Sequence, residues 1–246
     1  MITTFHLKNR EANKEISVHF CGEKIKNEKT PVYLGITLNR RLSFKTHLLK
    51  VSAKFKTRIG LINKLAGITW GAATHTLRTS SLALTYSVAE YCASVWAGSA
   101  HTEVVDIQLR KVLRTISGTV LSTKEQWLPY LASIEPPHIR RQNSELPIHE
   151  DGIINPRLKS RKSFLFRARI ITEMRENTPD VWQAEWQQER AGGIQIDNVR
   201  TPVLGMNLPR KTWVRLNIIR TGQGRCNELM HKWKFVAWLD HLDIDI

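Results

Sequence analysis

The first 38 residues carry patterns that are typical of β-strands. Ile16-Ser17-Val18-His19-Phe20 alternates apolar and polar side chains, which predicts a half-buried strand. The next four residues, Cys21-Gly22-Glu23-Lys24, suit a hairpin turn. The run from Val32 to Leu38 is mostly apolar and β-prone, so we expect a more buried strand there, in which Gly35 indicates a close backbone approach or a bulge.

The apolar period lengthens from two to about 3.6 residues after residue 43, which predicts an amphipathic helix. Ser43 suits the N-cap of this helix, and Gly67 and Gly71 suit its end. Its apolar stripe comprises Phe44, Leu48, Val51, Phe55, Ile59 and Ile62. Most basic residues of the segment lie off this stripe, so we expect the helix to bury one side and to present cations on the other.

Two further helices are expected before residue 120. The first runs from about Thr74 to Trp96, with the apolar stripe Leu77, Ser81, Leu84, Val88, Tyr91 and Val95. The second begins at Thr102 and has Glu103 and Asp106 in its first turn, where the helix dipole favours acidic side chains. Its stripe is Val105, Leu109, Val112 and Ile116, and Gly118 suits the C′ position.

The pattern weakens after the short apolar segment that Trp127-Leu128-Pro129 opens. We expect helices over residues 161–177, 210–219 and 227–239, irregular structure over residues 190–209, and a break at Gly222-Gln223-Gly224. The whole pattern predicts an α+β chain that is mainly α-helical. Short N-terminal strands would precede a helical domain and a smaller helical C-terminal segment.

The charge of the chain favours a polyanionic partner. Lys and Arg number 37 and Asp and Glu number 22, giving a net charge of +15. No acidic residue occurs between Lys29 and Ala89, a window that holds ten basic residues. Such a window suits a surface that follows a phosphate backbone, and a merely solvated basic face is the alternative. A membrane surface fits this charge less well than nucleic acid does.

Other features narrow the class of protein. No apolar run reaches the roughly 20 residues that span a bilayer, and no signal peptide is visible. The three cysteines are too few and too far apart for a disulfide framework, so we expect an intracellular protein of the nucleus or cytoplasm. Trp70, Trp96 and Trp127 could stack on nucleic-acid bases, although core packing is the favoured interpretation for Trp96.

Several segments, taken together, resemble jockey-like non-LTR retrotransposon reverse transcriptases. Thr30 to Leu38 (TPVYLGITL) resembles the segment that closes the palm of that family, and Arg41 to Leu48 (RLSFKTHL) follows it at the family's distance. Ala89 to Trp96 (AEYCASVW) is similar to a helix of the family's thumb. Further similar segments are Ala53 to Arg58, Lys64 to Gly67, Trp70 to Ala72, Leu113 to Gly118, Leu208 to Arg210 and Arg220 to Cys226.

The resemblance implies a division of the chain and an activity. Residues 1–42 would be the end of the palm, 43–145 a thumb-like helical domain, 146–209 a linker or connector, and 210–246 a truncated C-terminal segment. The family's RNA-directed DNA polymerase holds two metal ions on paired aspartates. This chain contains no Asp-Asp dipeptide, and the resemblance places those aspartates before residue 1. No Cys follows Cys226, so the family's downstream Cys/His cluster is missing as well.

We therefore expect a partial reverse transcriptase that is inactive on its own, with no catalytic residue, no metal site and no cofactor. Mg²⁺ is implied only for the full-length family enzyme. The expected partner is RNA, an RNA–DNA hybrid or a DNA duplex, bound without sequence preference, and no membrane is expected. The residues expected to contact phosphates are Arg40, Arg41, Lys45, Lys50, Lys54, Lys56, Arg58 and Lys64.

By the same resemblance, Tyr33-Leu34-Gly35 would lie at the hairpin that supports the primer end. Whether the chain is an enzyme stays open, because the family is enzymatic but the catalytic aspartates are missing. The alternative function is a host-adopted or relic basic helical module that binds nucleic acid without an enzymatic role. Nothing in the sequence indicates an oligomeric state.

Overall fold

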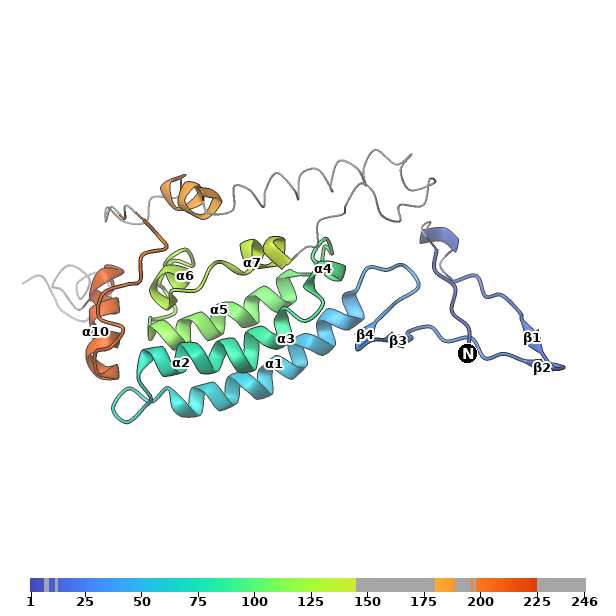
Figure 1. Ribbon diagram of the computed structural model, residues 1–246, viewed down its shortest axis with the longest axis horizontal. Helices are drawn as coiled ribbons and strands as arrows, with labels where there is room; N and C mark the ends of the chain where they lie inside the picture. Colours follow the sequence, from blue (N-terminus) through green and yellow to red (C-terminus); the bar gives the residue numbers. More distant parts are fainter. Residues whose placement is uncertain (7–8, 12, 145–179, 189–195, 197, 225–246) are drawn as a thin grey trace, which may run out of the picture.

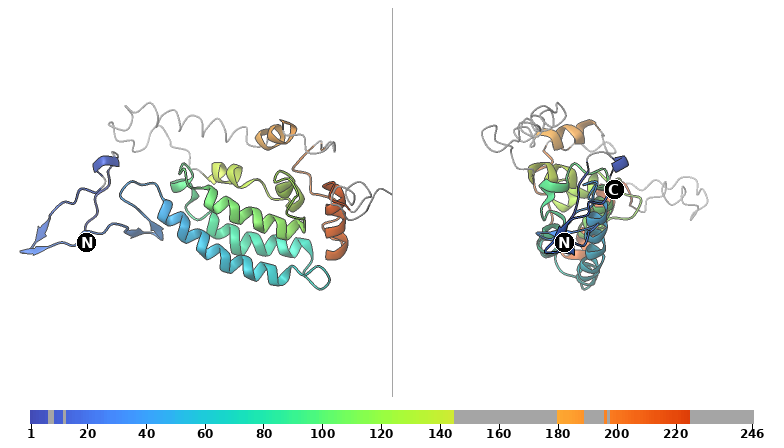
Figure 2. Two further views of the ribbon diagram at one scale, coloured as in Figure 1. Left: turned by 180° about the vertical axis from the view of Figure 1, so that it is seen from behind. Right: turned by 90° about the vertical axis from the view of Figure 1, so that its right-hand side faces the viewer.

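The chain forms a bundle of helices that follows two short antiparallel hairpins (Figures 1 and 2). The computed structural model describes residues 1–6, 9–11, 13–144, 180–188, 196 and 198–224. The expected helices over residues 161–177 and 227–239 lie outside these residues. The fold class is α+β and mainly α-helical, as the sequence predicts.

The N-terminal hairpin is much shorter than expected. Strand β1 (His19–Phe20) pairs with β2 (Glu23–Lys24) around Cys21 and Gly22, whose φ angles of 51° and 83° are those of a two-residue hairpin turn. The predicted turn is therefore confirmed. The predicted half-buried strand over residues 16–20 is wrong, because only His19 and Phe20 belong to the strand and the apolar Ile16 and Phe20 are 49% and 72% exposed.

The run from residue 32 to 38 is not one buried strand but a second hairpin. Strand β3 (Val32–Tyr33) pairs with β4 (Ile36–Thr37), and the chain reverses at Leu34 and Gly35, where φ is 45° and 79°. Only β4 is buried. The single-strand prediction fails because the turn occurs within an apolar run and uses leucine, which rarely adopts a left-handed backbone.

Helix α1 (Lys45–Leu65) buries the predicted stripe but begins differently from the prediction. Phe44 stands at the N-cap with φ 58°, and the hydroxyl of Ser43 does not cap the helix. Among the described residues, no side chain caps the first turn, and the Oδ1 of Asn39 instead accepts the N–H groups of the two residues before the helix, Ser43 at 2.9 Å and Phe44 at 3.2 Å. The helix ends at Leu65 with Ala66 at the C-cap, so Gly67 directly follows its end as expected, whereas Gly71 lies further along the loop.

The helix expected over residues 74–96 is divided. It consists of α2 (Thr74–Ser81), the π-helix η2 (Leu82–Tyr86), α3 (Ser87–Ala89) and, after a break, α4 (Ala93–Trp96). The predicted stripe is correct at Leu77 and Ser81 but wrong at Leu84, Tyr91 and Val95, which are exposed. A π-helical turn holds more residues than an α-helical one, so it shifts the buried face. The buried residues after Ser81 are Thr85, Tyr86, Ala89, Ala93 and Trp96.

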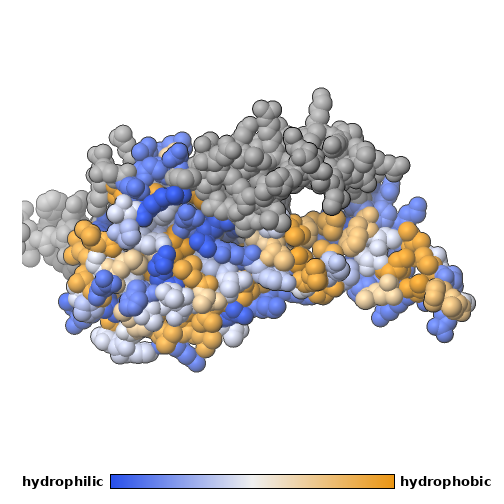
Figure 3. Space-filling model, in the orientation of Figure 1, coloured by the Kyte–Doolittle hydropathy of each residue, from blue (hydrophilic) through white to orange (hydrophobic). Residues whose placement is uncertain are grey.

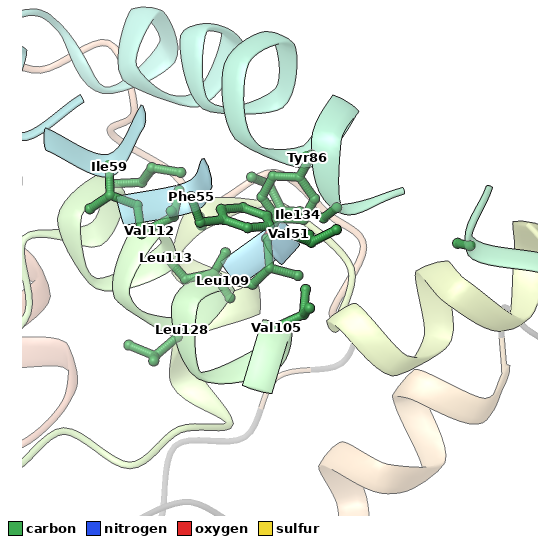
Figure 4. Close-up of a cluster of buried hydrophobic side chains, with 14 of the residues drawn as sticks. Val51, Phe55, Ile59, Tyr86, Val105, Leu109, Val112, Leu113, Leu128 and Ile134 are labelled. Carbon is green, nitrogen blue, oxygen red and sulfur yellow. The ribbon is translucent and has the colours of Figure 1, made fainter. Parts of the chain in front are cut away.

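Helix α5 (Glu103–Ser117) matches the prediction closely. The expected stripe is buried, and Gly118 ends the helix with φ 70° while its N–H donates to the carbonyl of Arg114 at 2.8 Å. Helices α1 and α5 run in the same direction, with α2 antiparallel to both (Figures 1 and 2). Their shared core gathers Val51, Phe55 and Ile59 from α1 against Val105, Leu109 and Val112 from α5 (Figure 4).

A second core joins distant parts of the chain. Trp127 and Leu131 of α6 (Trp127–Ala132) and Ile139 of α7 (Pro137–Ser144) pack with residues from beyond position 180. Those residues are Trp182, Trp186, Val199, Val203 and Trp213. The rings of Trp127 and Trp186 meet edge to face, with centroids 5.1 Å apart. Residues 180–188 form a helix that the sequence pattern did not predict.

Helix α10 (Arg210–Arg220) confirms the helix predicted at 210–219 and crosses the end of α5 (Figure 1). Its side chains bind the last carbonyls of α5, which have no partner within their own helix. Arg210 donates to the carbonyls of Thr115 and Ile116, and the Asn217 amide donates to that of Ser117 at 2.9 Å. Burial lowers the pKa of Arg210 to about 10, so this cation remains charged near neutral pH.

The division into palm end, thumb, linker and C-terminal segment stays a prediction. Within the range assigned to the linker, the described residues 180–188 and 198–209 contribute Trp182, Trp186 and Val203 to the second core. Within the described part of the chain, no helix combines the length and the apolar character needed to cross a membrane.

Candidate nucleic-acid interface

Three of the expected phosphate-binding lysines share one stripe of α1. At 100° per residue, the side chains of Lys50, Lys54 and Lys64 fall within an arc of about 80°, away from the buried stripe. All three side chains are exposed. We call these residues the lysine stripe. From its first to its last member, the stripe extends about 21 Å along the helix axis.

The structure does not bring Lys56 into this stripe. Lys56 follows Lys54 by two residues, which turns it about 160° around the helix axis. It is exposed, on the same flank of α1 as Lys45 and Asn63. The Asn63 Oδ1 accepts a hydrogen bond from the Thr115 hydroxyl of α5 at 2.9 Å, so this flank is the one beside α5.

The other expected contacts differ in how available they are. Arg40 is buried, and its guanidinium pairs with Glu15 at 2.9 Å, so it is already bound within the fold. Arg58 donates to the backbone carbonyl of Leu84 in the π-helix. Arg41 and Lys45 are exposed and line an open hollow of 650 Å³ at the start of α1, together with Lys29, Glu15 and Arg40.

The lysine stripe has no carboxylate partner among the residues that the structure describes. Lys50 Nζ donates only to the hydroxyl of Thr37, at 3.1 Å, and no ion pair involves Lys54 or Lys64 in this part of the chain. An uncompensated row of cations on a helix of a strongly basic chain produces a positive potential that attracts phosphates.

The effect of this potential is visible at His47, which is buried beside the stripe. Burial is the main cause that lowers its pKa below the ordinary value of 6.5, and the charges of Lys54 and then Lys50 lower it further. The neutral ring accepts the backbone N–H of Thr37 at its Nδ1, 3.3 Å away. His47 thus joins α1 to strand β4.

The residues expected at the primer end, Tyr33-Leu34-Gly35, lie at the tip of the β3–β4 hairpin. Tyr33 and Leu34 are exposed, and apolar patches alternate with polar ones over the strand region (Figure 3). Tyr91, which the helical pattern assigned to the core, holds this tip instead. Its hydroxyl donates to the Leu34 carbonyl at 2.9 Å, and its ring stands 3.3 Å from where a Cβ on Gly35 would lie. The close approach predicted at Gly35 is therefore found.

A cavity of 370 Å³ lies on another part of the molecule, between α5, α6 and the helix at 180–188. Its charged lining groups are paired with each other or with neighbours. Arg110 pairs with Glu103 and Glu125, and the His138 ring lies 3.0 Å from the Glu185 carboxylate. This cavity therefore offers little uncompensated charge to a ligand. Among the described residues, no three His, Cys, Asp or Glu side chains gather as metal ligands.

Comparison with known proteins adds no assignment to this geometry. No family model, curated protein or solved structure matches the chain.

Proposed function

We propose that this chain is a partial non-LTR retrotransposon reverse transcriptase that binds a template–primer duplex through helix α1. The observation that carries the proposal is the lysine stripe, three exposed lysines on one side of α1 without a carboxylate among the described residues. The similar sequence segments support the family, and the net charge of +15 supports a polyanionic partner.

The dimensions of the stripe suit a duplex. Successive phosphates of one strand are separated by about 3.4 Å along the duplex axis, so about 21 Å of helix runs beside roughly six of them. Lysines reach phosphates as flexible point charges and read no base edge. The bound duplex would therefore be positioned without regard to its sequence.

The salt dependence of binding tests the proposal. The triple variant Lys50→Glu, Lys54→Glu and Lys64→Glu should weaken duplex binding strongly, as measured by fluorescence anisotropy of a labelled duplex. The slope of log K against log salt should become shallower by about three, since each lysine on a phosphate contributes about one. The matched control is Lys14→Glu, Lys24→Glu and Lys26→Glu, which changes the net charge equally at exposed positions outside the acid-free window.

Equal losses in both triple variants would contradict the proposal, because they would show that net charge and not the stripe governs binding. A strong preference for one RNA sequence would favour the alternative of a host-adopted binding module. Primer extension with Mg²⁺ or Mn²⁺ tests the catalytic part of the proposal. We expect no synthesis by the purified chain, because it contains no Asp-Asp pair.

A further inference from the structure

The three tryptophans that could stack on bases occupy different environments. Trp96 and Trp127 are 1% and 4% exposed and belong to the two cores, so the core interpretation of Trp96 is confirmed. Trp70 is 73% exposed, in the loop between α1 and α2. Single exposed apolar side chains are common on protein surfaces, so exposure alone assigns no role to Trp70.

The indole of Trp70 packs against the backbone of its own loop. The N–H of Gly71 donates to the carbonyl of Gly67 and that of Ala72 to the carbonyl of Leu65, both at 2.8 Å. A Cβ built on Gly67 would lie 2.4 to 2.8 Å from Cε2, Nε1 and Cδ2 of the indole. These atoms are central in the ring system, so the ring lies flat on the backbone of Gly67. One face of the ring is covered by glycine, and the other is open.

The surroundings of Trp70 suit a nucleotide. The acid-free window from Lys29 to Ala89 includes the whole loop, so no carboxylate near it in sequence would repel a phosphate. Lys64, the last member of the lysine stripe, lies six residues before Trp70 and is exposed. The loop lies at the end of the bundle away from the strands, so it continues the direction in which the stripe runs along α1 (Figures 1 and 2).

We propose that Trp70 is a stacking platform for an unpaired base at the end of a duplex bound along the lysine stripe. This inference rests on the proposed function and names a further site for it. An unpaired base at the end of a duplex has a free aromatic face, and an indole that already packs on Gly67 has fewer orientations to lose when it stacks on that base. The chain would then prefer a duplex with a single-stranded extension to the same duplex with a blunt end.

The test compares the full chain with Trp70→Ala and Trp70→Phe by fluorescence anisotropy. Three labelled probes are needed, namely a blunt duplex, the duplex with a short single-stranded extension, and the duplex with an abasic extension that keeps the phosphates. The unsubstituted chain should bind the extended duplex about tenfold more tightly than the other two. Trp70→Ala should lose this preference but keep its blunt-duplex affinity and salt slope, and Trp70→Phe should retain most of the preference.

Two outcomes would overturn the stacking inference alone. The first is that Trp70→Ala still prefers the extended duplex to the blunt one. The second is that the unsubstituted chain binds the base-bearing and the abasic extensions equally. The proposed function would still stand if the lysine-stripe variant lost blunt-duplex binding. Failure of the unsubstituted chain to bind any probe would overturn both proposals. Since Trp70 is exposed, Trp70→Ala should melt at the temperature of the unsubstituted chain, and Trp70→Phe provides a second variant if it does not.

Discussion

Helices α1 and α5 lie side by side and share one apolar core, but their charged residues have different surroundings. The lysine stripe of α1 is exposed and has no carboxylate partner in the described part of the chain. Around α5, by contrast, Arg110 pairs with Glu125 at 3.2 Å and Arg141 binds Asp106 through both of its terminal nitrogens. The comparison separates cations that hold the fold together from cations that remain available to a ligand.

Burial explains why the two helices differ. Arg141 and Asp106 are both buried, and a charge removed from water is tolerated only with an opposite charge and hydrogen bonds. Arg140 of α7 and Glu90 at the end of α3 are half-buried and form a similar pair. The lysines of α1 keep their hydration, so the fold does not require a partner for them.

Removal of the buried arginine should produce the largest effect. Arg141→Ala leaves the carboxylate of Asp106 buried without this partner and should lower the free energy of unfolding by about 3 kcal/mol. Urea denaturation measures this change. Asp106→Ala, added to the first substitution, should restore part of the loss, because it removes the stranded charge. A loss below about 1 kcal/mol for Arg141→Ala would show that water screens the pair.

Substituting one glycine on each helix should change the stability of the chain in opposite directions. The substitution at the end of α5 should have the larger effect. Gly118 has φ 70°, and a Cβ there would come 2.3 Å from Cγ2 of Val214 in α10. Gly118→Ala should therefore destabilise the chain by about 2 kcal/mol, through backbone strain and overlap with α10. Thermal melting followed by circular dichroism would reveal it. An unchanged melting temperature would mean that α10 does not dock as described.

The matched substitution on α1 should stabilise the chain slightly. Gly60 lies in the middle of α1, and a Cβ there would meet nothing within 4 Å. Gly60→Ala should raise the free energy of unfolding by about 0.5–1 kcal/mol, because alanine loses less backbone entropy in a helix. The same urea experiment measures it, and a decrease would show that this side of α1 is covered.

The smallest expected effect concerns the protonation of His47. Its pKa should lie below 6.5 and should rise when Lys54→Gln removes a neighbouring positive charge, whereas Lys56→Gln on the opposite flank should leave it unchanged. Duplex phosphates at the lysine stripe should raise it too. Histidine ring resonances, followed by NMR against pH, give the pKa directly. If the pKa of His47 did not change when duplex was added, the phosphates would bind away from the lysine stripe.

The same shift makes stability depend on pH. Because the unfolded chain binds the His47 proton more tightly than the folded chain does, the free energy of unfolding should fall as the pH drops below about 6.5. His47→Gln should flatten this part of the profile. Urea midpoints at a series of pH values provide the measurement.

Sequence periodicity predicted the bounds and the buried face of α5, but it did not do so for the segment from 74 to 96. In α5, an apolar stripe, acidic residues in the first turn and a terminal glycine all indicate the same helix. In the second segment, the residues Leu82 to Tyr86 carry no signal that distinguishes a π-helix from an α-helix. The phase of the stripe is therefore lost after Ser81, and Tyr91 was assigned to the core although it holds the β3–β4 tip.

The candidate site was predictable in part for a similar reason. The sequence predicts that the lysine stripe is exposed, because Lys50, Lys54 and Lys64 belong to one helix and their spacing places them away from its apolar stripe. The pairing of Arg40 with Glu15 joins residues 25 positions apart, and no helical period relates them. The helix at 180–188 was not predicted, although the spacing of Trp182 and Trp186 by four residues was a usable signal.

The docking of α10 on α5 has a consequence for how the protein is made. The amide of Asn217 binds the carbonyl of Ser117, 100 residues earlier in the chain. Ribosomes add about 5–20 residues per second, so on the order of 5–20 s separate the synthesis of these two partners. Throughout that interval the side chains of α10 are not yet available to the last carbonyls of α5 or to the apolar residues that α10 later covers. The nascent bundle thus becomes complete only when its latest described helix leaves the ribosome.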